Sequence, residues 1–177
     1  MATLEPRTVE PVPVKHLFLD LEDTVITSVT TGWADTEIIN RDKVKAFLAA
    51  YKPDFVHIFS FAIWHAEDLA SFDWSVKPRL EKAFGVSIHT APMLDTDILN
   101  ACCNTKWISP ENITRREVID FWGKQDGFRL FVRNKFAKPF STRIVTDVVL
   151  LDDMVEHEEF AYPEQGLRGR ILNIADI

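Results

Sequence analysis

Cysteine is scarce in this chain. The 177 residues contain only Cys102 and Cys103, which are adjacent. Adjacent cysteines strain an intramolecular disulfide and cannot link distant parts of a fold. No further cysteine and no nearby histidine at ligand spacing accompanies them, so a zinc site is not expected there. The sequence therefore predicts a fold without disulfides in a reducing compartment, and we expect a cytoplasmic location.

Long apolar runs, internal repeats and low-complexity tracts are also lacking. Residues 1–15 contain acidic side chains and three prolines but no apolar stretch. They therefore predict neither a secretion signal nor a membrane-spanning helix, and no membrane association is expected. We expect a flexible arm over residues 1–13 and one domain over 14–177, because this length is short for two typical domains.

Basic residues are outnumbered by acidic ones. Lys and Arg total 20 and Asp and Glu total 27, which gives a net charge of −7. Such a surface repels a phosphate backbone, so non-specific nucleic-acid binding is not expected. Hydrophobic residues make up 46% of the chain, which excludes an intrinsically disordered protein.

Acidic residues are concentrated where an apolar run ends near the amino terminus. Leu17, Phe18 and Leu19 are followed by Asp20-Leu21-Glu22-Asp23-Thr24. Carboxylates crowded at the end of a buried strand repel one another and lose water, so they usually persist because a cation or a reacting phosphate compensates them. This pattern predicts a phosphoryl-transfer site.

A second apolar run has the same ending. Val148 to Leu151 runs directly into Asp152 and Asp153. In a parallel sheet the carboxyl ends of the strands meet at one edge, where α/β proteins gather their ligands. We therefore expect the two acidic ends to be neighbours that a single metal ion can bridge.

The two motifs, in this order, resemble those of the haloacid dehalogenase (HAD) superfamily of aspartate-nucleophile phosphatases. That family has a Ser or Thr at the end of its second strand, and here 55–59 runs into Ser60. It also has a lysine shortly before the second acidic strand. Lys138 is the best-placed candidate, with Lys135 as the reserve.

The resemblance implies a role for each matching residue. Asp20 would be the nucleophile that forms an aspartyl phosphate, Glu22 the general acid and base, and Ser60 and Lys138 the groups that hold the phosphoryl oxygens. The cofactor would be Mg²⁺, which prefers oxygen ligands. The expected metal site comprises Asp20, the backbone carbonyl of Glu22, Asp152 and, directly or through water, Asp153.

One position departs from the family pattern. The family has Asp two positions after the nucleophile, whereas this chain has Glu22. The longer arm displaces the carboxylate by about 1 Å, and misplacement on that scale can cost roughly 100-fold in rate. Two hypotheses follow: a Mg²⁺-dependent phosphatase acting on a phosphate monoester, or a catalytically lapsed HAD-like domain that serves as a binding or regulatory module. The sequence does not decide whether the phosphorylated substrate is a macromolecule or a small molecule. It also does not decide whether the chain assembles into a homo-oligomer.

Strand-like and helix-like segments alternate along the chain. This order predicts an α/β fold with a doubly wound parallel sheet of the Rossmann-like, HAD-like type. The third strand is either Val86 to His89 or Phe128 to Val132. A β-hairpin flap bearing Trp33 and a small helical insert are also expected, as in family members with a minimal cap. The other expected strands cover residues 14–19, 55–59, 144–151 and 170–174. Four helices are expected: one that follows Asn40, one over 64–84 with an interruption near 73–78, one over 95–103, and one that ends at Gly123.

Overall fold

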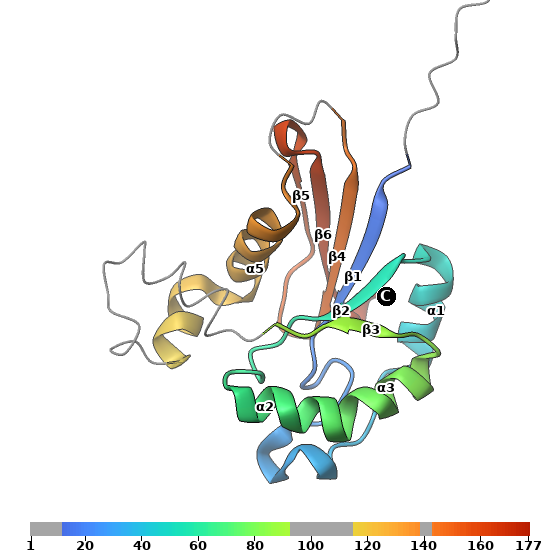
Figure 1. Cartoon of the computed structure of the whole chain (residues 1–177), viewed down its shortest axis with the longest axis vertical. Coiled ribbons are helices and arrows are strands. Elements are labelled where there is room, and N and C mark those ends of the chain that lie inside the picture. Colours follow the sequence, from blue (N-terminus) through green and yellow to red (C-terminus); the bar gives the residue numbers. More distant parts are fainter. Residues whose placement is uncertain (1–11, 93–114, 139–142) are drawn as a thin grey trace, which may run out of the picture.

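One six-stranded sheet organises the chain (Figure 1). The computed structural model describes residues 12–92, 115–138 and 143–177. The strand order is β3-β2-β1-β4-β6-β5, in which β5 alone runs antiparallel to its neighbour. The strands are β1 (Val14–Leu19), β2 (Phe55–Ile58), β3 (Ile88–Thr90), β4 (Thr146–Asp152), β5 (Glu158–Tyr162) and β6 (Leu167–Asn173).

The two apolar runs that precede the acidic motifs form the centre of this sheet. β1 and β4 pair in parallel from Val14 opposite Thr146 to Leu19 opposite Leu151. Strands that are covered on both faces have continuous apolar sequences rather than alternating apolar and polar residues. The predicted neighbourhood of the two acidic strand ends is therefore confirmed.

Helices cover both faces of the sheet (Figure 1). Leu17 and Leu19 of β1 point to the face that is covered by α1 (Arg41–Tyr51) and α3 (Lys77–Phe84). Phe18 points to the other face, where it packs against Phe128 of α5 (Arg115–Phe136). The predicted α/β class and the mostly parallel sheet are thus confirmed. In the described part of the chain, no helix combines the length and apolar character needed to cross a membrane.

The helical predictions before residue 85 are confirmed. α1 begins after Asn40 and ends at Tyr51, ahead of Pro53. The predicted helical stretch from 64 to 84 is divided into α2 (Ala66–Ser71), a π-helical segment η3 (Phe72–Val76) and α3. Gly85 ends α3 in the left-handed conformation, with φ 71°, where a residue without Cβ is favoured.

Later in the chain one prediction is wrong, one is confirmed and one strand was not predicted. Phe128 to Val132 is not a strand but part of α5, and its buried residues Phe128, Phe131 and Val132 have helical spacing. Gly123 ends the first helical segment of α5, as predicted: its backbone is not helical, with φ 61°, and a second segment follows this kink and continues to Phe136. The edge strand β5, which begins at Glu158, was not predicted.

These results decide between the two candidates for the third strand. The strand β3 at Ile88–Thr90 overlaps the alternative Val86 to His89, and it pairs in parallel with β2. The helix predicted over residues 95–103, and with it much of the expected insert, lies outside the described residues, as does most of the predicted amino-terminal arm.

The predicted flap between β1 and α1 is only in part a hairpin. Its two arms are joined by an antiparallel bridge between Ile26 and Ile38. Its tip instead forms two short 3₁₀ turns, η1 (Val29–Thr31) and η2 (Trp33–Asp35). The Trp33 ring packs edge-on against Phe72, with 6.3 Å between the ring centroids, which anchors the flap to η3.

Candidate functional site

Three carboxylates meet where β1 and β4 end. Asp20, Asp152 and Asp153 each offer an oxygen, and these oxygens lie within 4.8 Å of one another. The backbone N–H of Asp20 donates to the carbonyl of Leu151 at 3.0 Å, so the pairing of β1 with β4 continues into the site. The structure therefore brings together the three carboxylate side chains that were predicted to bind a metal.

Two of these carboxylates are almost completely removed from solvent. Asp20 is 4% exposed and Asp152 is 0% exposed. Oδ1 of Asp152 accepts a hydrogen bond from the N–H of Met154 at 2.8 Å, whereas Oδ2 has no hydrogen-bond partner. Asp153 is less buried and accepts a hydrogen bond from the Thr24 hydroxyl at 3.2 Å. A buried carboxylate oxygen without a hydrogen bond is costly unless a cation compensates it.

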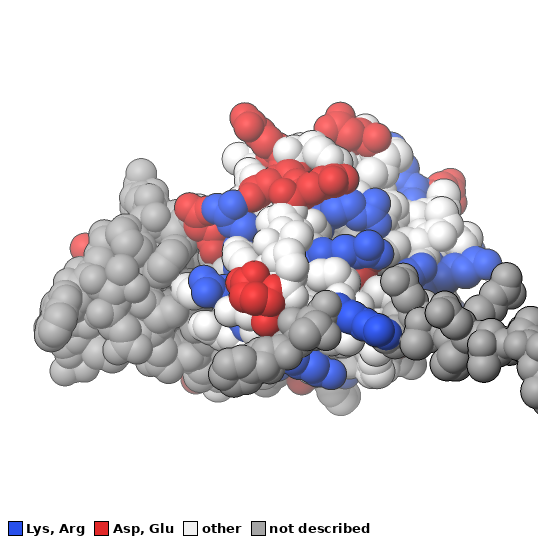
Figure 2. Space-filling view, turned by 90° about the horizontal axis from the view of Figure 1, so that it is seen from above, with Lys and Arg blue, Asp and Glu red and all other residues white. Residues whose placement is uncertain are grey.

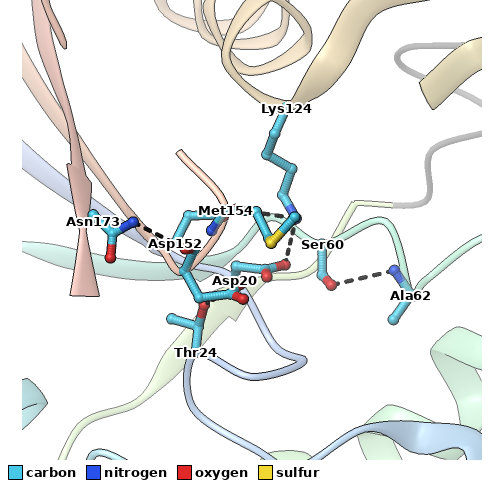
Figure 3. A network of polar contacts seen from close by, with 9 residues as sticks. Asp20, Thr24, Ser60, Ala62, Lys124, Asp152, Met154 and Asn173 are labelled. Carbon is cyan, nitrogen blue, oxygen red and sulfur yellow. Dashed lines mark hydrogen bonds and ion pairs between the residues drawn. The ribbon is translucent and has the colours of Figure 1, made fainter. Parts of the chain in front are cut away.

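Lys124 supplies a cation to this cluster. Figure 3 shows its side chain extending from α5 toward Asp20. Its Nζ lies 2.7 Å from Oδ1 of Asp20 and 3.1 Å from Oδ2 of Asp152, the second contact being an ion pair without hydrogen-bond geometry. The ammonium also lies 4.8 Å from the centroid of the Phe61 ring. Lys124 follows the kink at Gly123, so the local break in α5 is what places this lysine at the strand ends.

The lysines predicted for this role lie elsewhere. Lys138 and Lys135 line a cavity with Val14 and Thr146, the first residues of β1 and β4, and thus occupy the opposite edge of the sheet. The N–H of Lys138 donates to the carbonyl of Gln165. The structure thus does not bring Lys138 or Lys135 to Asp20; the lysine that it places there is Lys124. Sequence reasoning missed Lys124 because 128–132 was expected to be a strand, whereas Lys124 belongs to a helix that leads toward the second acidic strand.

Ser60 completes the site from the neighbouring strand. It follows β2, is 2% exposed, and its Oγ accepts a hydrogen bond from the N–H of Ala62 at 3.2 Å (Figure 3). The site thus draws on the ends of three adjacent parallel strands, β2, β1 and β4, and on α5. This is the edge at which α/β proteins bind their ligands.

Burial and charge shift the proton affinities of the site. Burial raises the pKa of Asp20 to about 6; Lys124 opposes the rise, and Asp152 adds to it. Burial lowers the pKa of Lys124, but the carboxylates of Asp20 and Asp152 outweigh it, so the net pKa is above the ordinary value. Burial and the charge of Asp152 also raise the pKa of Asp153. Lys124 therefore remains charged at neutral pH and balances only part of the negative charge of the cluster.

Glu22 is held away from the three carboxylates. Its Oε1 accepts hydrogen bonds from the Ser28 hydroxyl at 3.1 Å and from the N–H of Val29 at 2.9 Å. Its side chain does not belong to the carboxylate group that can hold a metal. The structure thus does not bring the Glu22 side chain, the predicted general acid and base, together with Asp20, Asp152 and Asp153, because hydrogen bonds fix it to the base of the flap.

The donor set fits a hard divalent cation. Mg²⁺ prefers carboxylate, carbonyl and water oxygens, and the three clustered aspartates offer carboxylates only. The Oδ2 of Asp152 has no hydrogen-bond partner and is compensated only by its ion pair with Lys124, so this oxygen is available to a cation. No sulfur or imidazole ligand takes part in this cluster of described residues, so its chemistry is not that of a zinc site.

Comparisons with protein-family models, with curated proteins and with solved structures found no match to this chain. The resemblance to the HAD superfamily therefore depends on the motifs and on their arrangement in the fold, and it stays a prediction.

Proposed function

We propose that this chain is a HAD-like, Mg²⁺-dependent phosphatase that hydrolyses a phosphate monoester through an aspartyl phosphate on Asp20. The observation that carries the proposal is the position of Asp20 at the end of a central strand, where the Lys124 ammonium contacts its carboxylate and that of Asp152. A carboxylate that is buried, partly neutralised and fixed by a rigid sheet is suited to attack a phosphorus atom.

The proposed reaction has two steps. In the first step an oxygen of Asp20 attacks phosphorus, a new O–P bond forms, the ester O–P bond breaks, and the protonated carboxyl of Glu22 gives its proton to the leaving oxygen. In the second step water attacks the phosphorus of the aspartyl phosphate and gives a proton to the Glu22 carboxylate; the aspartyl O–P bond breaks, which releases inorganic phosphate and regenerates Asp20. Lys124 and the Ser60 hydroxyl would donate hydrogen bonds to the phosphoryl oxygens and offset the negative charge that develops on them.

The carboxylates of Asp20, Asp152 and Asp153 would hold the metal ion. When bound, Mg²⁺ would supply positive charge to the phosphoryl oxygens during transfer. Asp152 and Asp153 would then have a binding role only, while Asp20 would have a binding and a nucleophilic role. Thr24 would orient Asp153 through their hydrogen bond.

Glu22 is the residue on which turnover depends most directly in this proposal. To protonate the leaving oxygen, its carboxylate would have to exchange the hydrogen bonds from Ser28 and Val29 for one to the substrate. The same two hydrogen bonds favour the second candidate, a catalytically lapsed domain that keeps the metal site for binding or regulation. The two candidates therefore differ in whether Glu22 leaves the flap.

A direct test measures hydrolysis of p-nitrophenyl phosphate with and without Mg²⁺ by the wild type and by Asp20→Asn. The phosphatase proposal expects metal-dependent turnover that the variant loses. Metal-dependent turnover that Asp20→Asn retains would overturn the proposed nucleophile. A wild type that binds Mg²⁺ but hydrolyses neither this ester nor a panel of phosphorylated proteins, nucleic-acid ends and metabolites would favour the binding module.

A further inference from the structure

A second concave site lies on the face of the sheet that carries α1. Its volume is about 780 Å³, within the usual range for pockets that bind small molecules. One wall is the last part of α1, and the other consists of β6 and β5. We name it the Tyr51 pocket; it is lined by Lys15, Phe47, Ala50, Tyr51, Asp147, Glu159, Phe160, Ala161, Arg168, Gly169 and Arg170.

The Tyr51 pocket is separate from the site at the strand ends. Lys15 is the second residue of β1, whereas Asp20 follows the last residue of that strand. At the usual rise per residue the two positions are about 16 Å apart along the strand. Lys15, Asp147 and Arg168 are successive register partners across β1, β4 and β6, so they form a row near the beginning of the strands. Figure 2 looks onto this end of the molecule and shows basic side chains gathered beside acidic ones.

The positive charges of this pocket are only partly balanced. Arg168 forms an ion pair with Asp147, with Nη2 at 2.8 Å and Nε at 3.2 Å from the same carboxylate oxygen. The other acidic lining residue, Glu159, is 71% exposed in its side chain and lies 3.9 Å from His157. In the described part of the chain, neither Lys15 nor Arg170 forms an ion pair through its side chain.

These two cations are held against one aromatic ring. The Nζ of Lys15 lies 5.3 Å from the centroid of the Tyr51 ring, and the guanidinium carbon of Arg170 lies 5.6 Å from it. The ring is fixed, because the Tyr51 hydroxyl donates to the carbonyl of Asp147 at 3.1 Å. Lys15 is oriented by a hydrogen bond from its Nζ to the carbonyl of Tyr51 at 3.0 Å. Two like charges held in one concave site repel each other, and a bound anion would relieve that repulsion.

We propose that the Tyr51 pocket binds a small organic anion in which a phosphate or carboxylate group is joined to an apolar or aromatic body. The Arg170 guanidinium and the Lys15 ammonium would hold the anionic group, since a guanidinium fork suits both phosphate and carboxylate. The apolar body would lie against Phe47, Ala50 and Ala161, which line the same pocket. This binding does not depend on the proposed phosphatase activity.

The test titrates the full chain, without Mg²⁺, with AMP, inorganic phosphate and adenosine, and follows binding by calorimetry and by backbone amide shifts. AMP is the probe because it joins a dianion to an aromatic body. We expect AMP to bind more tightly than either fragment and to shift the amides of residues 47–51 and 167–170. Citrate serves as the carboxylate probe and should compete with AMP.

Variants separate this pocket from the rest of the surface. Arg170→Gln and Lys15→Gln should each weaken AMP binding about tenfold or more, because each removes a charge-assisted contact. Lys45→Gln is the matched control, since it removes an exposed positive charge from the same helix α1. Asp20→Asn should leave AMP binding at the pocket unchanged, even if it abolishes turnover.

Several outcomes would overturn the proposal. The first is that neither AMP nor citrate binds at millimolar concentration, and the second is that adenosine binds as tightly as AMP. The third is that Lys45→Gln weakens AMP binding as much as Arg170→Gln does, and the fourth is that Asp20→Asn abolishes AMP binding. A dimer that Arg170→Gln dissociates, without anion binding, would assign the pocket to a second copy of the chain. Thermal unfolding of each variant verifies that a loss of binding is not a loss of folding.

Discussion

The ammonium of Lys124 lies 2.7 Å from Oδ1 of Asp20, although the two residues are 104 positions apart in the chain. Asp20 is placed by the central strand β1, and Lys124 is placed by the kink at Gly123 in α5. The contact therefore links α5, which covers one face of the sheet, to the carboxyl end of β1. If the proposed chemistry is correct, this pair is its centre.

Replacing Lys124 by Ala should abolish most of the phosphatase activity. We expect kcat/KM for p-nitrophenyl phosphate to fall by about 10²–10³-fold, the range for removing one donor that stabilises transition-state charge. Lys138→Ala is the matched control and should have no effect, because Lys138 lies at the opposite edge of the sheet. Equal losses in the two variants would contradict the assignment of Lys124.

Mg²⁺ should stabilise the folded chain through the three aspartates. Binding to the folded state alone raises the free energy of unfolding by about 2.7 kcal/mol when Mg²⁺ is at 100 times its dissociation constant. Asp152→Asn should remove this gain, and without metal the variant should be at least as stable as the wild type, because it relieves the repulsion among three clustered carboxylates while Lys124 keeps its ion pair with Asp20. Urea unfolding with and without Mg²⁺ measures both quantities.

Asp73→Asn is the control for the metal experiment, since Asp73 is exposed and lies in η3 rather than at the strand ends. It should unfold with the same Mg²⁺ dependence as the wild type. A Mg²⁺ effect that persists in Asp152→Asn would show that the ion binds elsewhere.

The flap should control the activity of Glu22. Ser28→Ala removes one of the two hydrogen bonds that hold its carboxylate, so we expect kcat to rise if release of Glu22 limits the rate. Glu22→Gln should lower kcat by about 10²–10⁴-fold, the usual contribution of a general acid or base. Glu22→Asp restores the family residue and should retain or increase turnover.

Glu37→Gln is the control for these flap variants, because Glu37 is an exposed residue of the same loop. Steady-state kinetics with p-nitrophenyl phosphate would compare all four variants. If Glu22→Gln were as active as the wild type, Glu22 would not be the general acid and base.

The sequence was most informative where an apolar run and a polar ending coincide. β1 and β4 were predictable because buried parallel strands require unbroken apolar residues, and their acidic ends gave Asp20 and Asp152 directly. Ser60 was found in the same way, from the strand that precedes it. In each case one local pattern contains both the element and the functional residue.

Lys124 and the edge strand could not be found in this way. The run from 128 to 132 is short and apolar, and such a run fits a strand or a buried helical turn equally well. Gly123 indicates the break that precedes Lys124, but the position of this lysine also depends on how α5 packs against the sheet, which no local pattern encodes. β5 was missed because Glu158 and Glu159 are poor strand formers, and their pairing with β6 determines their conformation.

A buried pair of histidines should make the stability of the chain depend on pH. Nδ1 of His16 lies 2.9 Å from Nε2 of His57, and Nδ1 of His57 lies 2.7 Å from the Thr90 hydroxyl. Burial, His16, His89 and Lys135 lower the pKa of His57 from 6.5 to about 3. Burial also lowers the pKa of His16, with Asp54 opposing. Both rings are therefore neutral in the folded chain at neutral pH.

Because these pKa values are lowered by folding, the unfolded chain binds protons first as the pH falls below 6.5. Stability should thus be fully present above pH 6.5 and should decrease as the pH falls toward 3, by up to about 1.4 kcal/mol per pH unit for each histidine. Urea unfolding of His57→Gln between pH 8 and pH 4 should show a weaker dependence on pH than the wild type. His65→Gln, which changes an exposed histidine, should keep the wild-type dependence, and the same slope in all three proteins would refute the role of the buried pair.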